Sequence, residues 1–205
     1  VWMGSRHTKL VDTQVNVALR LICGAVQPTE VEWLNVLSNI APMNIIKDES
    51  AWRDCKKSIR MTSYRSSMTN ISSNNPKIKI KFTVLALFDS NNLINLKSRW
   101  RNWWSDADVH NRKLIGDPTT EVFGYGLPRR MWLRLNRIRT GQGCCAFLLY
   151  HWNVIESLLC ECREDQTMKH SVGECSIHRF QGKIEDIHVS TMEATAWISN
   201  LSVDI

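Results

Sequence analysis

The chain has 205 residues, of which 43% are hydrophobic and 22% are charged. This composition excludes an intrinsically disordered protein and suffices for one medium domain or two small ones with a hydrophobic core. No stretch approaches the roughly 18 consecutive apolar residues of a membrane span, and the first residues lack the pattern of a secretory signal. Because the sequence begins at Val1 rather than at a methionine, we expect it to be a piece of a longer protein.

The formal net charge of +6 is distributed unevenly along the chain. Residues 56–112 contain 11 basic and 3 acidic residues, whereas residues 144–205 contain 4 basic and 9 acidic ones. The basic middle and the acidic C-terminal part are therefore predicted to have different roles.

Two amphipathic helices are predicted near the start of the chain. Apolar residues recur at steps of three and four over residues 10–23, and this pattern ends at Gly24. A second helix is expected over residues 30–39, where Thr29 and Glu32 have the spacing of a capping box.

The middle of the chain has weaker patterns. Residues 58–75 are mostly polar and lack periodicity, which is typical of a linker, and any hinge is expected there. Residues 77–84 alternate polar and apolar side chains, as a half-buried strand does. Trp100, Trp103 and Trp104 lie beside basic residues. This cluster either packs against a neighbouring helix or stacks on nucleic-acid bases.

An arginine-rich helix is predicted over residues 128–140, with Gly141 ending it. Arg130, Arg134 and Arg137 share the face opposite its apolar side, so this helix is expected to present a purely cationic face to solvent. Either these arginines contact phosphates, or they pair with the acidic C-terminal part. The residues for which nucleic-acid contact is predicted are Arg129, Arg130, Arg134, Arg137 and Arg139.

A fourth helix is expected over residues 191–200, where Ser190 and Glu193 form a second capping box. The periodicities together predict a mainly α fold with at most one small sheet.

Seven cysteines in a chain without an export signal favour a reducing, intracellular compartment, where thiols bind metals or simply pack. Cys23 and Cys55 are isolated, and we expect them to be small buried hydrophobic residues. The other five fall within 32 residues: Cys144, Cys145, Cys160, Cys162 and Cys175.

Cys160, Cys162, His170 and Cys175 form the pattern C-x-C-x7-H-x4-C. Three thiolates and one imidazole, arranged in two pairs around a short loop, suit a tetrahedral zinc ion. Because the protein would fill all four positions, no place for a catalytic water would remain, and the zinc would be structural. The alternative is a group of thiols without a metal.

No catalytic residue is predicted. The chain lacks the motifs of nucleophilic hydrolases, phosphate-binding loops, zinc proteases and dinucleotide-binding folds, so by itself it is not expected to be an enzyme. His178 and His188 are expected to be surface residues rather than metal ligands.

Several phrases of the sequence resemble a known protein family. The stretch from Leu127 to Gly143, the pair Cys160-x-Cys162 and the stretch from Gln166 to Cys175 resemble the C-terminal region of reverse transcriptases from jockey-like non-LTR retrotransposons. Residues 2–42 are similar to the segment that follows the polymerase domain, at its thumb. Two positions depart from the family pattern: Cys144 stands in place of arginine, and Arg163 in place of a glycine suited to a positive φ.

The resemblance implies three parts: a thumb-like helical segment (1–46), a variable basic linker (47–92), and an arginine-rich helix with a CCHC zinc-knuckle module (93–205). It implies a fragment of an RNA-directed DNA polymerase that contributes nucleic-acid binding, with RNA, DNA and the rest of the polyprotein as partners, in the nucleus or cytoplasm. The polymerase's catalytic motif would lie outside this chain. The alternative is a non-catalytic structural or protein-interaction domain, a relic of a mobile element.

Overall fold

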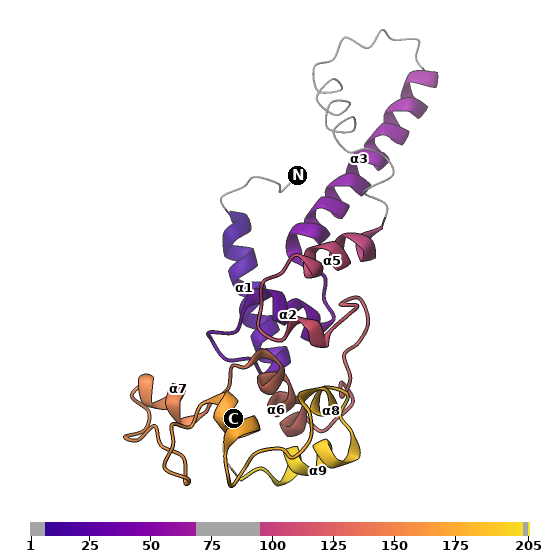
Figure 1. The fold of residues 1–205 in the computed structure, drawn as a ribbon. Coiled ribbons are helices and arrows are strands. Elements are labelled where there is room, and N and C mark those ends of the chain that lie inside the picture. Colours follow the sequence, from indigo (N-terminus) through magenta and orange to yellow (C-terminus); the bar gives the residue numbers. More distant parts are fainter. Residues whose placement is uncertain (1–6, 69–94, 203–204) are drawn as a thin grey trace. The chain divides into compact units, whose positions relative to one another are not determined.

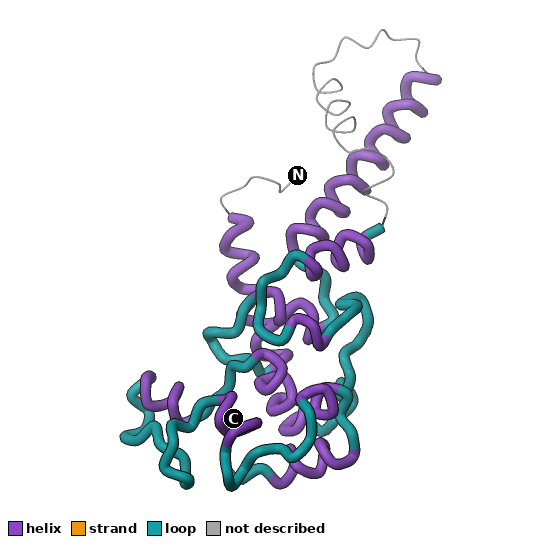
Figure 2. Tube along the Cα trace, viewed as in Figure 1, coloured by secondary structure: helices purple, strands orange, loops and turns teal. Residues whose placement is uncertain are grey.

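The computed structural model describes residues 7–68, 95–202 and 205. Within these residues the chain forms helices joined by loops, with one isolated antiparallel bridge and no longer strand (Figure 1 and Figure 2). The prediction of a mainly α fold is thus confirmed, while the predicted strand at 77–84 lies outside the described residues. Within the described part, no helix combines the length and apolarity needed to cross a membrane.

The chain divides into two compact units. Unit 1 comprises residues 1–12 and 41–105, as far as they are described, and unit 2 comprises residues 13–40 and 106–205. This division cuts the predicted segment 1–46, because the end of the first helix bonds to the arginine-rich helix within unit 2.

Unit 1 contains the start of α1 (His7–Cys23), α3 (Met43–Met68) and α5 (Leu96–Ser105). α3 packs against α5, and an ion pair of 2.7 Å between Asp48 and Arg99 joins them. Trp100 is buried in a small core with Ala41 and Ile45. Trp104 is also buried, and Trp103 packs against this core, so the tryptophan cluster follows the packing interpretation.

α3 corrects the predicted linker at 47–92. Residues 47–68 are helical, and the expected hinge at 58–75 therefore begins inside a helix; residues 69–92 lie outside the described part. α3 shows no apolar stripe in sequence; where its side chains are described, it supplies Ile45 and Ile46 to the small core.

Unit 2 contains the other three predicted helices and several short elements that the sequence did not indicate. Its main core lies among α6, α8 and α9 and includes Leu135, Ile187 and Ile198, each at most 1% exposed. The elements in chain order are the end of α1, α2 (Val31–Ser38), a 3-10 turn (Arg112–Leu114), α6 (Arg129–Thr140), α7 (Ala146–His151), a π turn (His170–Glu174), α8 (Ile184–His188) and α9 (Met192–Asn200).

The helices predicted at 10–23, 30–39, 128–140 and 191–200 are confirmed as α1, α2, α6 and α9. Gly141 ends α6 with a φ of 67°, as predicted. Both capping boxes are wrong in detail. Glu30 is the N-cap of α2 and makes no side-chain capping bond. The N-cap of α9 is Thr191, whose hydroxyl accepts from the N–H of Ala194 at 3.3 Å, one residue later than predicted.

Candidate metal centre

Cys160 and Cys162 lie on a tight turn closed by the bridge between Leu159 and Asp165. The N–H of Cys160 donates to the carbonyl of Glu164, and the N–H of Arg163 donates to the carbonyl of Cys160, both at 2.8 Å. Arg163 has a φ of 74°, the left-handed conformation that favours glycine. Because arginine has a Cβ, this conformation costs about 1–2 kcal/mol. The two hydrogen bonds of the turn offset this backbone strain.

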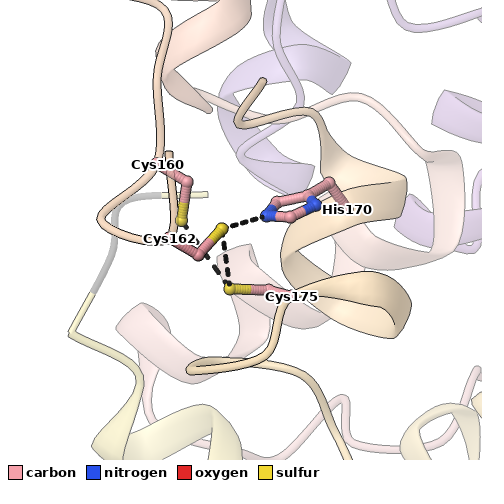
Figure 3. Close-up of side chains that lie close together, drawn as sticks. All are labelled: Cys160, Cys162, His170 and Cys175. Atoms are coloured by element: carbon pink, nitrogen blue, oxygen red, sulfur yellow. Dashed lines mark hydrogen bonds between the residues drawn. The ribbon is translucent and has the colours of Figure 1, made fainter. Parts of the chain in front are cut away.

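His170 and Cys175 lie at the two ends of the π turn. The N–H of Cys175 donates to the carbonyl of His170 at 2.7 Å, and the N–H of His170 is capped by the hydroxyl of Thr167 at 3.1 Å. This five-residue turn brings the imidazole and the thiol to the same side, facing the turn that carries Cys160 and Cys162 (Figure 3).

The four predicted ligands converge. Their ligand atoms all lie within 4.8 Å of one another. The sulfur of Cys175 is 3.7 Å from that of Cys160 and 3.8 Å from that of Cys162. A tetrahedral metal with bonds of about 2.3 Å to sulfur requires an edge of about 3.8 Å. The Nε2 of His170 is 3.1 Å from the sulfur of Cys162. This cluster could hold a metal ion, and no second group of this kind occurs among the described residues.

Burial and hydrogen bonds act in opposite directions on the thiols. Burial raises the pKa of Cys175. The N–H groups of His178 and Ile177, each 3.4 Å from its sulfur, and the neighbouring thiols lower this pKa, and their combined effect exceeds that of burial, so that the pKa is about 7. Burial and the adjacent thiols raise the pKa of Cys160. A metal cation at the centre would favour the thiolate form of each cysteine.

His178 is buried beside this centre, so its prediction as a surface residue is wrong. Its carbonyl accepts from the indole N–H of Trp197 at 2.8 Å, and its Nδ1 is 3.5 Å from the hydroxyl of Ser202. Its Nε2 lies 3.7 Å from the carboxylate of Glu161, between the first two cysteines. The residue thus links the cysteine turn to α9 and the segment after it, a role that the isolated histidine in the sequence gave no signal of.

The arginines of α6 do not form the predicted cationic solvent face. Arg129 and Arg130 are exposed, Arg137 is half-buried, and Arg134 and Arg139 are only 5% and 1% exposed. The buried guanidinium groups bond within unit 2 and cannot reach a ligand in solvent. The alternative expectation that these arginines pair with acidic residues is also wrong for Arg137, because main-chain oxygens of Gly24 and Ile205 accept its hydrogen bonds.

Side chains of α6 donate hydrogen bonds to the last carbonyls of α1. A helix leaves its last four carbonyls without partners inside the helix. The carbonyl of Arg20 accepts from the N–H of Ala25, and that of Cys23 accepts from the side-chain amide of Asn136 at 3.0 Å. The two between them, those of Leu21 and Ile22, accept from the guanidinium of Arg129. All four carbonyls are therefore satisfied, two of them by a cation, which also suits the negative end of the helix dipole.

Arg139 and His188 form a buried polar contact within unit 2. The Nε of Arg139 donates to the Nδ1 of His188 at 3.1 Å, and Nη2 donates to the carbonyls of Phe123 at 2.6 Å and His188 at 2.7 Å. Nη1 donates to the side-chain oxygen of Asn136 at 3.2 Å. Burial, followed by the charge of Arg139, lowers the pKa of His188 to about 4, so this histidine is neutral at pH 7. His188 is thus buried, and its prediction as a surface residue is wrong.

The chain matches no model of a known protein family, and searches of curated proteins and of solved structures find no significant match.

Proposed function

We propose that the centre binds one structural zinc ion through Cys160, Cys162, His170 and Cys175. The convergence of these four side chains carries the proposal, because three thiolates and an imidazole at tetrahedral spacing are a preferred zinc set. The zinc would hold the cysteine turn against the π turn, and with four protein ligands it would have no open position for catalysis.

Metal analysis of the purified chain tests this proposal. We expect one zinc per chain in the wild type and none in Cys175→Ser. The control is Cys144→Ser, because Cys144 is half-buried and lies outside the cluster; this variant should keep its zinc. A wild-type chain that takes up no zinc, or a Cys175→Ser variant that retains it, would refute the metal site.

We further propose that the chain is the C-terminal part of a non-LTR retrotransposon reverse transcriptase and contributes nucleic-acid binding without catalysis. The resemblance of its phrases supports this origin, and the convergence of the residues in its C-x-C and H-x4-C phrases supports the zinc-knuckle part of it. The polymerase chemistry would belong to the remainder of the protein.

Charge segregation favours unit 1 as the source of phosphate contacts. Its described residues, 7–12, 41–68 and 95–105, include 10 basic and 4 acidic residues, whereas those of unit 2, 13–40, 106–202 and 205, include 12 basic and 14 acidic ones. Lys57 and Lys97 are exposed on α3 and α5, and Lys56 lies 4.6 Å from the ring centre of Trp52. Among the arginines predicted to contact nucleic acid, only Arg129 and Arg130 remain exposed, and Arg129 already bonds to α1.

The salt dependence of RNA binding tests this assignment. Replacing Lys56, Lys57 and Lys97 by glutamine should reduce the slope of log affinity against log salt by about 2 for a single-stranded RNA, since each phosphate contact contributes about 0.7 to the slope. The control, Arg130→Gln in unit 2, should change the slope by less than about 1. An unchanged slope in the triple variant would refute phosphate contact by unit 1.

The second candidate function is protein interaction by unit 2. One observation favours it: the arginines that would grip a phosphate backbone serve internal hydrogen bonds, and the remaining charge of this unit is acidic.

A further inference from the structure

One segment of unit 2 has several apolar side chains that are exposed to solvent. Residues 146–165, the knuckle arm, contain α7 and the loop that leads to the cysteine turn, and they extend to one side of α6 and α9 (Figure 1). The base of the arm is fixed, because the buried side chain of Gln166 accepts from the N–H of Ala146 at 2.7 Å and its carbonyl accepts from the N–H of Phe147 at 3.2 Å. Leu148 packs against the main core.

The outer side of the arm is aromatic. Phe147 is 36% exposed and Tyr150 is 40% exposed, and both contact the ring of His151 edge to face, at centroid distances of 4.6 and 5.9 Å. Trp152 follows at 42% exposure and Val154 at 65%. Because the rings of Phe147 and Tyr150 already lie against His151, a partner would meet a surface that needs little ordering. Adjoining exposed rings of this kind mark interaction sites more often than scattered apolar residues do.

The charge of the arm is negative. Its single Lys or Arg residue is Arg163, and its four acidic residues are all exposed: Glu156, Glu161, Glu164 and Asp165. A polyphosphate would be repelled by this surface, whereas lysine or arginine side chains would be attracted to it.

We infer that the knuckle arm docks a basic protein segment that carries apolar side chains. The aromatic rings of α7 would bury those apolar side chains, as aromatic anchors do at protein interfaces, and the exposed acidic residues of the arm would pair with lysines or arginines. The inference rests on the proposed zinc site in one respect: the metal would hold the far end of the arm through Cys160 and Cys162. A nucleic-acid ligand would need more cations than Arg163, the one Lys or Arg of the arm.

A peptide of four Lys-Leu repeats serves as the probe, with four Glu-Leu repeats and a 20-nucleotide polyuridylate as comparison ligands. We expect the full-length chain to bind the lysine peptide more weakly as salt rises, and to bind the glutamate peptide at least tenfold more weakly. The double variant Phe147→Ser/Tyr150→Ser should lose at least tenfold in affinity for the lysine peptide. Glu156→Gln/Glu164→Gln should lose affinity and salt dependence together.

The matched control is Leu21→Ser, which removes an apolar side chain that is 71% exposed on α1, away from the arm; it should bind the peptide like the wild type. Zinc content and far-UV circular dichroism of every variant establish that it is folded and loaded. Equal peptide affinity of the folded double variant and the wild type would overturn the inference, as would polyuridylate binding that the same variant abolishes. Failure of the zinc proposal is distinguishable, because it would appear as a wild-type chain without metal.

Discussion

Replacing Arg139 by methionine should strongly destabilise unit 2. The side chain of Arg139 is 1% exposed, and its guanidinium supplies hydrogen bonds to two carbonyls, to the ring of His188 and to the amide of Asn136. Methionine has a similar length and apolar volume, so the substitution removes the donors with little loss of packing. The acceptors on His188 and Asn136, which are buried, and the part-buried carbonyl of Phe123 would then lose their donor.

The expected loss follows from those acceptors. A buried polar group that loses its partner costs about 1–3 kcal/mol. The carbonyls of Phe123 and His188, which accept at 2.6 and 2.7 Å, make the two shortest of these hydrogen bonds and would lose this donor. Removal of the desolvated charge offsets part of this cost. We therefore expect a net loss of about 3 kcal/mol, which lowers the melting temperature by roughly 10 °C for a unit of this size.

Urea and thermal unfolding followed by far-UV circular dichroism measure this loss. Arg130→Met is the matched control, since Arg130 lies on the same helix but is exposed, and it should change the unfolding free energy by less than about 0.5 kcal/mol. If Arg139→Met lowers the unfolding free energy no more than Arg130→Met does, then the side-chain hydrogen bonds of Arg139 contribute nothing to stability. The structural role derived for this arginine would then be wrong.

Three further predictions concern pH, backbone strain and metal. Folding lowers the pKa of His188 from about 6.5 to about 4, so the neutral ring stabilises the folded state fully above pH 6.5, and this stabilisation is lost as the pH falls through 4. The variant His188→Asn keeps an acceptor but does not titrate. Relative to this variant, the free energy of unfolding of the wild type, measured by urea titration, should fall by up to about 3 kcal/mol over this pH range. Arg163→Gly should raise the stability of the metal-loaded chain by about 0.5–1 kcal/mol in urea unfolding, because relief of the positive φ exceeds the added entropy of the unfolded chain; a loss would show that the Arg163 side chain is needed. A chelator should lower the urea midpoint of the wild type and zinc should restore it, whereas Cys175→Ser should respond to neither.

The sequence predicts the metal cluster better than it predicts the arginines. Cysteine and histidine residues at short spacing indicate a metal site from residue type alone, and the four predicted residues converge as expected. The four predicted helices could be recognised because an apolar stripe depends only on the order of residues within each helix. α3 lacks such a stripe, and it packs against α5, which is distant in sequence. The burial of Arg134 and Arg139 also depends on carbonyls of distant segments, which leave no mark on residue type.

Three of the acceptors of the α6 arginines are main-chain carbonyls near the ends of other helices, namely Ile22 in α1, Ile198 in α9 and His188 in α8. Every residue type carries a carbonyl, so a substitution at Ile22 or Ile198 leaves the acceptor in place, whereas no other side chain reproduces the planar fork of arginine. Evolutionary constraint on these contacts is therefore one-sided. Across related sequences, the arginine positions should stay constant while their partner positions drift freely, and methods that detect contacts from correlated substitutions would not see the bonds that join these helices.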